Sequence, residues 1–348
     1  MSKNLFFFFL SFFLLFFLPW TDKTETFAQY GRTNGNYEAI LAGFSRSYDD
    51  AAGWNHFVKL PYLDSPSIYY RVGDSQNWSE ERVINNLYAG TNKSFSLLIY
   101  GDYGIENSEN TTKSILTMLE KNRYQFVIHA GDLSYANNYP NYEDVWNKWF
   151  SLVDPVISRV PYQVSPGNHE VSCSSPSCLK STEDFVDFKY KFEMPGNESG
   201  SNTNMFYSYN YQNVHFVSIS TETDYPNSPK KENFGNKKDQ LLWLENDLIQ
   251  ANLPENRKKR PFIVCYGHRP IYTGNAEKNN QPNKYAKEIQ RSFEPLFQKY
   301  NVDFFFTGHV HNYQRNYPVY NNLVTSKDYN NYASTIHIIS GAAGQHEG

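Results

Sequence analysis

From residue 94 onward, short apolar runs alternate with stretches of helical periodicity, and this alternation limits the chain to layered α/β folds. We expect strands over residues 95–100, 126–130, 162–165, 214–220, 262–266, 303–307 and 335–340. We expect helices between them, over residues 111–121, 142–157, 183–192, 236–249 and 284–299. A chain of 348 residues, 40% of them hydrophobic, can form one large domain or two ordinary ones.

Glycine-containing motifs follow five of these expected strands. Glycine permits the sharp turn that directs a neighbouring side chain into a site at the strand ends, where α/β proteins place their chemistry. The motifs are Gly101-Asp102-Tyr103-Gly104, Gly131-Asp132-Leu133-Ser134-Tyr135, Gly167-Asn168-His169-Glu170, Gly267-His268-Arg269-Pro270 and Gly308-His309-Val310-His311. Aspartate, tyrosine, asparagine and histidine all coordinate metals. The first hypothesis is therefore a metal-dependent enzyme, with a phosphate ester as its substrate.

Three of the motifs carry residues with a specific metal preference. Asp102 and Asp132 are carboxylates, and one carboxylate can hold two cations close together. A free phenol has a pKa near ~10, but a hard trivalent ion such as Fe(III) can displace its proton, so Tyr135 favours iron in one site. On a regular strand His309 and His311 would share one face, with one imidazole for each metal. Each motif alone also has an ordinary interpretation as a turn or a packed side chain.

The two other motifs supply further candidate residues. Asn168 offers a neutral carbonyl oxygen, and His268 an imidazole that suits zinc or iron. His169 follows Asn168 directly, so it is better placed for substrate than for metal. Arg269 follows His268 and is a candidate to pair with a phosphate oxygen.

The motif set resembles the metallophosphoesterase superfamily, and specifically the purple acid phosphatases, over roughly residues 68–348. The family pattern is G-D-x-G, G-D-x-x-Y, G-N-H-E/D, V-x-x-H and G-H-x-H. The chain departs from it in the fourth motif, where Cys265 stands three residues before His268. The resemblance implies that Fe(III) is held by Asp102, Tyr135 and His311. It implies a divalent iron, zinc or manganese ion on Asn168, His268 and His309, with Asp132 bridging the two metals.

The same resemblance implies a fold and a reaction. The fold is α/β, a metallophosphoesterase-type β-sandwich flanked by helices. A metal-bound hydroxide would attack a phosphomonoester, as an acid phosphatase does, while His169 stabilises charge on the phosphoryl oxygens. The family histidine that protonates the leaving group has no counterpart in residues 275–278, which leaves a water or Glu277 as general acid. The alternatives are a phosphodiesterase or nucleotide pyrophosphatase with the same centre, and a non-catalytic secreted metal-binding glycoprotein.

Residues 1–28 are interpreted as a secretory signal peptide. Lys3 precedes an apolar stretch of 14 residues, from Leu5 to Leu18, which is shorter than the roughly 20 residues of a membrane-spanning helix. Thr26-Phe27-Ala28 offers a cleavage site before Gln29. An uncleaved N-terminal anchor is the alternative. Residues 29–93 are expected to form a partial, fibronectin-like β domain, and residues 94–348 the catalytic domain. Residues 341–348 resemble a family segment that normally continues.

A secretory signal affects how the localisation, the asparagine sequons and the cysteines are interpreted. The product is expected to be secreted or lumenal, including the lysosome or vacuole. The expected glycan acceptors are Asn77, Asn92, Asn110 and Asn197. Cys173 and Cys178 are close enough in sequence for a disulfide, although both could be free thiols, and Cys265 is expected to be a buried thiol. A net charge of -4 with no basic stripe argues against nucleic acid. The resemblance implies small phosphorylated molecules as the partners. No stable membrane span is expected.

Overall fold

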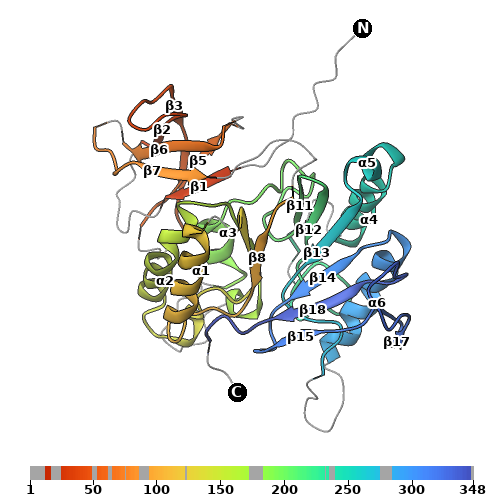
Figure 1. The fold of residues 1–348 in the computed structure, drawn as a ribbon. Coiled ribbons are helices and arrows are strands. Elements are labelled where there is room, and N and C mark those ends of the chain that lie inside the picture. The colour runs from red at the N-terminus through yellow and green to blue at the C-terminus, as the bar shows by residue number, and fades with distance from the viewer. Residues whose placement is uncertain are drawn as a thin grey trace.

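The computed structural model describes residues 12–16, 25–48, 53–61, 65–74, 76–85, 94–121, 124–171, 183–231, 233–234, 240–274 and 284–345. A small all-β region formed by the N-terminal part of the chain lies against a larger α/β region (Figure 1). The motifs identified in the sequence all belong to the α/β region.

Two sheets form the centre of the α/β region. The smaller has the order β10-β9-β8 and is parallel. Its strands are β8 (Leu97–Tyr100), β9 (Phe126–Ala130) and β10 (Tyr162–Ser165). The larger has the order β11-β12-β13-β14-β18-β15, with both edge strands antiparallel to the parallel middle. Its strands are β11 (Tyr207–Tyr211), β12 (Val214–Ser218), β13 (Phe262–Tyr266), β14 (Phe304–Thr307), β15 (Tyr313–Arg315) and β18 (Ile336–Ser340). A separate hairpin joins β16 (Val319–Tyr320) and β17 (Leu323–Val324).

Helices cover the outer faces of both sheets (Figure 1). The smaller sheet packs against α1 (Glu109–Glu120) and α2 (Tyr142–Ile157), and the larger against α4 (Gln240–Ala251) and α6 (Lys284–Lys299). Shorter helices are α3 (Val186–Lys191), α5 (Pro254–Lys259) and the 3₁₀ turns η1 (Ala136–Asn138) and η2 (Asn168–Glu170). The predicted fold, a β-sandwich flanked by helices, is confirmed.

The sequence of β13 shows why it belongs in the middle of a layered fold. Ile263 and Cys265 face the α4/α6 layer, whereas Val264 and Tyr266 belong to the core between the sheets. This alternation follows from the two-residue period of a strand. Both faces are buried, so the strand is apolar throughout, as parallel strands usually are. Cys265 is fully buried, as expected.

Most of the expected elements begin and end within three residues of the observed ones. The sequence did not predict β11, α5 or the short strands β15 to β17. Strand β11 alternates tyrosine with polar residues, in a chain with 28 tyrosines in which such a pattern is easily overlooked. In the three-dimensional structure its buried tyrosines Tyr207, Tyr209 and Tyr211 pack in the core between the sheets.

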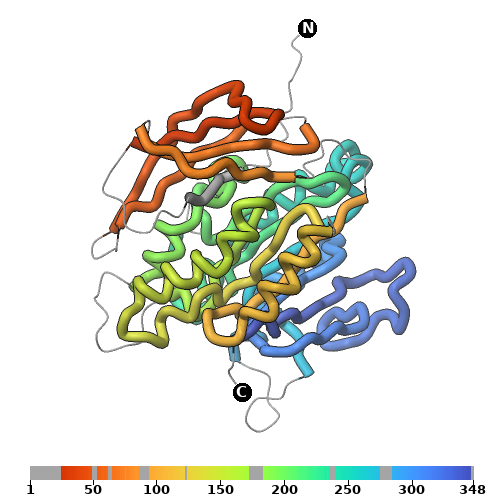
Figure 2. Tube along the Cα trace, turned by 60° about the vertical axis from the view of Figure 1, so that its left-hand side comes forward, coloured from red at the N-terminus to blue at the C-terminus, as the bar shows by residue number. Residues whose placement is uncertain are grey.

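The N-terminal region contains two further small sheets. One has the order β3-β2-β6-β7 and the other the order β1-β5-β4. The strands are β1 (Phe12–Phe16), β2 (Phe27–Gly31), β3 (Ala39–Ala42), β4 (Phe44–Arg46), β5 (Asn55–Leu60), β6 (Ser67–Gly73) and β7 (Arg82–Asn85). Ala28, Val58, Ile68 and Ile84 share one core, so the two sheets form a small sandwich. Figure 2 shows this sandwich lying along one side of the α/β region.

Polar contacts join the N-terminal sandwich to the α/β region. The Tyr70 hydroxyl donates to the carbonyl oxygen of Ser158 at 2.7 Å. Arg82 forms a two-pronged ion pair with Asp154 in α2, with N–O distances of 2.7 and 3.1 Å. The contacts cross between regions far apart in sequence, and they place the sandwich beside α2.

The predicted signal peptide overlaps the folded N-terminal region. Its residues 12–16 form β1, which pairs with β5. The predicted cleavage point after Ala28 falls inside β2, so cleavage there would remove part of that strand. Residues 1–11 and 17–24 lie outside the described part, and the signal peptide stays a prediction. No helix within the described residues is both long and apolar enough to cross a membrane.

The expected modification sites are only partly covered by the structure. The side chains of Asn77, Asn110 and Asn197 are exposed, as a glycan acceptor must be. Asn92 and the cysteine pair at 173 and 178 lie outside the described residues. Glycosylation and the disulfide therefore stay predictions.

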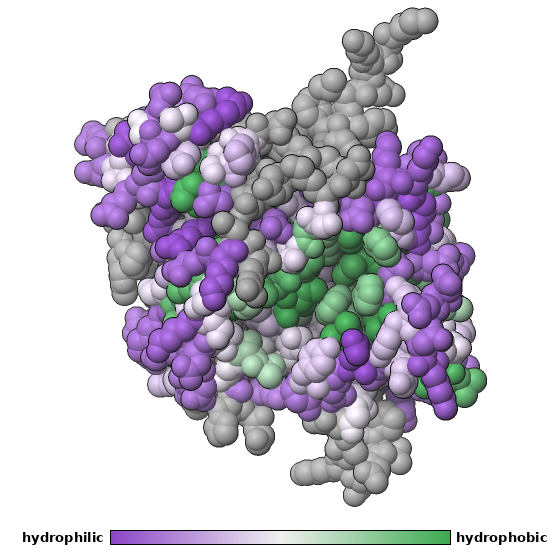
Figure 3. Space-filling view, viewed as in Figure 1, coloured by the Kyte–Doolittle hydropathy of each residue, from purple (hydrophilic) through white to green (hydrophobic). Residues whose placement is uncertain are grey.

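One face of the α/β region exposes apolar side chains. In Figure 3 apolar residues gather in the middle of this face, in the region where Figure 1 places β8, β13 and β14. Strands β8 and β14 carry hydrophobic side chains that are only partly buried, including Leu98, Phe304 and Phe306. The hydrophobic core between the two sheets therefore reaches the surface beside β8 and β14.

Candidate metal centre

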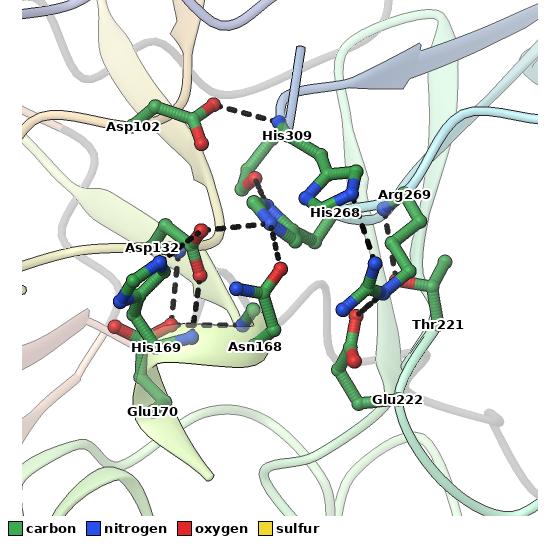
Figure 4. Close-up of polar contacts among 12 residues, drawn as sticks. Asp102, Asp132, Asn168, His169, Glu170, Thr221, Glu222, His268, Arg269 and His309 are labelled. Atoms are coloured by element: carbon green, nitrogen blue, oxygen red, sulfur yellow. Dashed lines mark hydrogen bonds and ion pairs between the residues drawn. The ribbon is translucent and has the colours of Figure 1, made fainter. Parts of the chain in front are cut away.

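The five glycine motifs come together at one rim because each begins where a parallel strand ends. Asp102 follows β8, Asp132 follows β9 and Asn168 follows β10. His268 follows β13 and His309 follows β14, in the other sheet. The Gly101 N–H donates to the carbonyl oxygen of Ser340 at 2.8 Å and so joins the rims of the two sheets. Figure 4 shows the side chains from both sheets converging on one space.

The turns at this rim hold several side chains in an unusual backbone conformation. Positive φ angles, which residues other than glycine rarely adopt, occur at Asp102 (63°), Asp132 (52°), Tyr135 (56°) and His309 (66°). Such conformations cost of order 1–3 kcal/mol each and cluster at functional sites. Gly167 is required for space, since an added Cβ would lie 2.2 Å from Asp132 Oδ1.

A first group of possible ligands surrounds the Tyr135 hydroxyl. The hydroxyl oxygen lies 3.1 Å from Asp102 Oδ1 and 3.1 Å from His311 Nε2. His311 Nε2 is in turn 3.2 Å from Asp102 Oδ1. The Tyr135 hydroxyl is also 3.5 Å from Asp132 Oδ2, so this group extends toward the second one.

A second group surrounds the ring of His268. Its Nε2 lies 3.0 Å from Asp132 Oδ2 and 3.1 Å from Asn168 Oδ1. Possible ligand atoms of Asp132, His268 and His309 all lie within 4.8 Å of one another. His268 Nδ1 is 3.0 Å from the Ala130 carbonyl oxygen, which can only accept. That contact uses a ring hydrogen on Nδ1, so Nε2 is the nitrogen that faces the possible metal ligands, and its proton would have to leave when a metal ion binds.

Asp132 Oδ2 belongs to both groups, which is the position of a bridging carboxylate. Asp102 and Asp132 are almost fully buried, and in the described part of the chain their only ion-pair partners are histidines. Burial raises the pKa of Asp102. Burial opposes ionisation of Asp132 as well, but His268 and His169 outweigh it and lower the pKa of Asp132. Buried carboxylates without a lysine or arginine partner, surrounded by imidazole, phenol and amide groups, fit a pair of metal ions.

Glu170 is a structural member of the site that the sequence did not single out. Its carboxylate accepts hydrogen bonds from the backbone N–H groups of Asp132, Leu133 and Gly167, at 2.9, 2.7 and 2.8 Å. It thereby ties the motif after β9 to the motif after β10. Burial and the charge of Asp132 raise the pKa of Glu170 to about 8, against the effect of these backbone donors. The sequence contained a clue to this role, because Glu170 is the fourth residue of the Gly-Asn-His-Glu motif.

His169 lies beside Tyr135 and Asp132, and 13% of its side chain is exposed. Its Nδ1 is 2.8 Å from Asn137 Oδ1, and its ring packs against that of Tyr135 with 4.1 Å between centroids. Its Nε2 is 3.9 Å from Asp132 Oδ2, beyond hydrogen-bond distance. The side chain is thus oriented by Asn137, which the sequence did not identify.

Arg269 lies beside His309 and is engaged within the protein. Its Nε donates to Glu222 Oε1 at 2.8 Å, and its Nη1 is 2.9 Å from His309 Nε2. Its backbone N–H donates to Thr221 Oγ1 at 2.9 Å. A contact with phosphate would require a rearrangement of these bonds. Glu222 and Thr221 are fully buried.

The two histidines of the last motif take part in different groups, as expected, but for a different reason. The sequence argument placed them on one face of a regular strand. In the structure β14 ends at Thr307, and the positive φ of His309 belongs to a turn. The turn directs His309 toward His268 and Arg269, and His311 toward Tyr135. Glu277, one of the suggested general acids, lies outside the described residues.

Comparisons with known proteins agree with this geometry. Residues 95–313 match the calcineurin-like phosphoesterase family. Acid phosphatase type 7 of Mus musculus is 32% identical, and the match covers 84% of this chain and 64% of that protein. Purple acid phosphatase 18 of Arabidopsis thaliana is 30% identical, with 94% of this chain and 67% of that protein covered. The chain thus spans about two-thirds of the length of such relatives.

A solved structure gives the same result for the fold. The purple acid phosphatase isolated from yellow lupin (Lupinus luteus) seeds superposes with a TM-score of 0.72 at 25% identity. The superposition covers 93% of this chain and 60% of that one. The fold, the motifs and the relatives point the same way. The chain belongs to the calcineurin-like phosphoesterases, and among them to the purple acid phosphatases, a family with a dinuclear metal centre.

Proposed function

We propose that this protein is an acid phosphatase that hydrolyses phosphomonoesters at a centre of Fe(III) and one divalent ion. The observation that carries the proposal is the position of Asp132 Oδ2, within 3.5 Å of both Tyr135 and His268. Two groups of ligands that share one carboxylate oxygen are what a two-metal hydrolase requires.

The proposed roles of the ligands follow the two groups. Asp102, Tyr135 and His311 would hold Fe(III), since phenolate is a ligand for a hard trivalent ion. Asn168, His268 and His309 would hold iron, zinc or manganese, because a set of one amide oxygen and two imidazoles accepts several divalent ions. Bound metal ions would polarise a phosphoryl oxygen and supply a nucleophile from water.

The protein's own groups would complete the reaction. His169 is held by Asn137, and in its imidazolium form its Nε2 can donate to a phosphoryl oxygen as negative charge grows. The buried carboxylate of Glu170 fixes the turn that presents Asp132. Small phosphorylated molecules are the proposed substrates.

We place this activity in the secretory pathway, with the product outside the cell or in a lysosome or vacuole. The N-terminal apolar stretch and the exposed asparagines of three sequons support this proposal. Expression in a eukaryotic cell checks it. Protein in the medium should lose mass on treatment with an N-glycosidase and should begin near Gln29. Unprocessed protein that stays in the cytosol would contradict it.

The activity is tested on purified, metal-replete protein. Initial rates are measured with p-nitrophenyl phosphate and with bis(p-nitrophenyl) phosphate between pH 4 and 8, with Asp132→Asn as the inactive control. The proposal expects the monoester to react faster, at acidic pH. Faster cleavage of the diester would favour the phosphodiesterase or nucleotide pyrophosphatase alternative. Stoichiometric metal without turnover of either compound would favour a non-catalytic metal-binding glycoprotein.

A further inference from the structure

Arg269 forms a hydrogen bond with the imidazole ring of His309, which is a proposed metal ligand. Its Nη1 lies 2.9 Å from Nε2 of His309, while its Nε is bonded to the buried carboxylate of Glu222. Arg269 is itself largely buried, so this contact is built into the site and is not a chance surface encounter. Figure 4 shows the guanidinium lying between the glutamate and the histidine.

The chemistry of the two groups fixes the state of the ring. A guanidinium has only N–H donors, so Nε2 of His309 must accept the hydrogen bond from Arg269. A neutral imidazole carries one hydrogen, which must then be on Nδ1. Such a ring has no lone pair left for a metal ion. Whichever nitrogen binds the metal, the contact with Arg269 has to break first.

We propose that Arg269 competes with the divalent ion for His309. In the metal-free protein the guanidinium holds the ring, and the arriving ion displaces it toward Glu222. This inference rests on the proposed dinuclear centre. It makes Arg269 a positioning residue for the divalent half of the centre and leaves the half around Tyr135 unaffected.

Glu222 offers a place for the displaced guanidinium. Its Oε1 already accepts from Arg269 Nε, whereas its Oε2 is buried and accepts no hydrogen bond from the described residues. A buried carboxylate oxygen without a donor is costly, and Nη2, which shares an edge of the guanidinium with Nε, is the donor that can bond to it after the shift. After the shift, the other guanidinium N–H groups remain beside the centre, where a phosphate oxygen is a suitable acceptor.

Two measurements on metal-free protein test the competition. Long-range ¹⁵N–¹H spectra of ¹⁵N-histidine-labelled protein report which nitrogen of His309 carries the hydrogen, with His309→Gln to assign the signal. Calorimetric titration with Zn²⁺ reports the affinity of the site. The main variant is Arg269→Met/Glu222→Gln, which removes one positive and one negative charge together. Its matched control is Lys299→Met/Glu245→Gln, an exposed ion pair on α6 and α4.

The competition predicts a hydrogen on Nδ1 of His309 in the wild type. It predicts Zn²⁺ binding about tenfold tighter in the Arg269/Glu222 double variant, the fold-change that corresponds to loss of one competing hydrogen bond. Glu222→Gln alone, which leaves the guanidinium uncompensated, should bind Zn²⁺ more weakly than the wild type. The Lys299/Glu245 control should bind as the wild type does.

Other results would overturn the inference. A hydrogen on Nε2 of His309 in the metal-free wild type would show that Arg269 does not hold the ring. Unchanged Zn²⁺ affinity in the folded double variant would show that Arg269 does not compete with the metal ion and only balances the charge of Glu222. Weaker Zn²⁺ binding would show that Arg269 stabilises the metal-bound state. If the wild type bound no Zn²⁺ at all, the proposed centre itself would fail, and the inference with it.

Discussion

Among the described residues, two clusters of carboxylates lie at least partly buried, one at the metal centre and one that includes Tyr48 of the N-terminal part. The second cluster joins Tyr48 to Glu143 of α2 and Asp187 of α3, and Lys191 supplies one positive charge to the two carboxylates. The Lys191 Nζ lies 2.9 Å from Glu143 and 3.5 Å from Asp187. Asp102 and Asp132, in contrast, pair with histidines alone in the described part of the chain.

The difference separates a structural cluster from a functional one. A buried carboxylate must be neutralised by a proton, by a cationic side chain or by a metal ion. The cluster around Lys191 contains a cation for one carboxylate, and the raised pKa of Asp187 allows a proton to neutralise the other. The carboxylates of the cluster around Asp132 are surrounded by histidine, tyrosine and asparagine side chains, and the nearby arginine is paired with Glu222. Histidine, tyrosine and asparagine are metal ligands, so metal ions can take the place of the histidine protons there.

The largest expected effect is a loss of activity when the metal centre is altered, whereas the same change in the other cluster should have little effect on activity. Asp132→Asn removes a negative charge from both ligand groups, and since metal ions supply several kcal/mol of transition-state stabilisation, kcat/KM should fall by about a thousandfold or more. Asp187→Asn, the same change in the other cluster, should leave kcat/KM within about threefold. Metal content and initial rates of both variants check this. An active Asp132→Asn enzyme would remove the basis for a shared bridging carboxylate.

A smaller effect concerns the dependence of stability on pH in the cluster with its own cation. Burial raises the pKa of Asp187 to about 6, with Glu143 acting in the same direction and Lys191 against it. The folded state therefore binds a proton more readily than the unfolded chain, whose aspartate has the ordinary value of 3.8. The stabilisation is complete below that value and is lost as pH rises through about 6.

Urea unfolding at pH 4, 5, 6 and 7 measures this loss. The wild type should lose up to roughly 3 kcal/mol relative to Asp187→Asn over this range, since one pKa unit corresponds to about 1.4 kcal/mol. Comparing the two proteins cancels the pH effects that they share, including those of metal release. Parallel stability curves would mean that Asp187 stays ionised and that Lys191 dominates the cluster.

The smallest effect is expected where charges are paired near the surface. Arg82 and Asp154 join the sandwich to α2, but about a third of each side chain is exposed. Arg82→Met should lower the free energy of unfolding by no more than about 1 kcal/mol, as exposed ion pairs do. Arg32→Met, which removes a pair within the sandwich, is the control. A loss of several kcal/mol for Arg82 alone would show that this contact holds the two regions together.

The sequence predicted the centre better than its surroundings. Asp102, Asp132 and His268 follow glycines at the ends of apolar strands, and strand order in a layered fold brings such ends together. Glu170, Asn137 and Glu222 escaped because their roles depend on contacts between motifs far apart in sequence. Glu170 reaches back 38 residues to the backbone of Asp132, and no local pattern records that distance.

The N-terminal part shows a second limit of sequence reasoning. A charged residue, an apolar stretch and a small-residue site predict a signal peptide, yet β2 begins at Phe27 and is paired on both edges. Apolar segments satisfy the requirements of a signal and of a strand equally well. Strand pairing is a non-local property, so the pattern alone cannot assign residues such as Phe27 and Ala28 to one role.

We propose that Tyr135 and Asp132 belong to an iron-containing, two-metal centre. The most direct test is the visible absorption spectrum of the metal-replete protein, compared with Tyr135→Phe and with Tyr103→Phe, a buried tyrosine bonded to Thr112. The account predicts a broad charge-transfer band in the wild type and in Tyr103→Phe that is lost in Tyr135→Phe. A folded, metal-loaded wild type without such a band, or a band that persists in Tyr135→Phe, would contradict it.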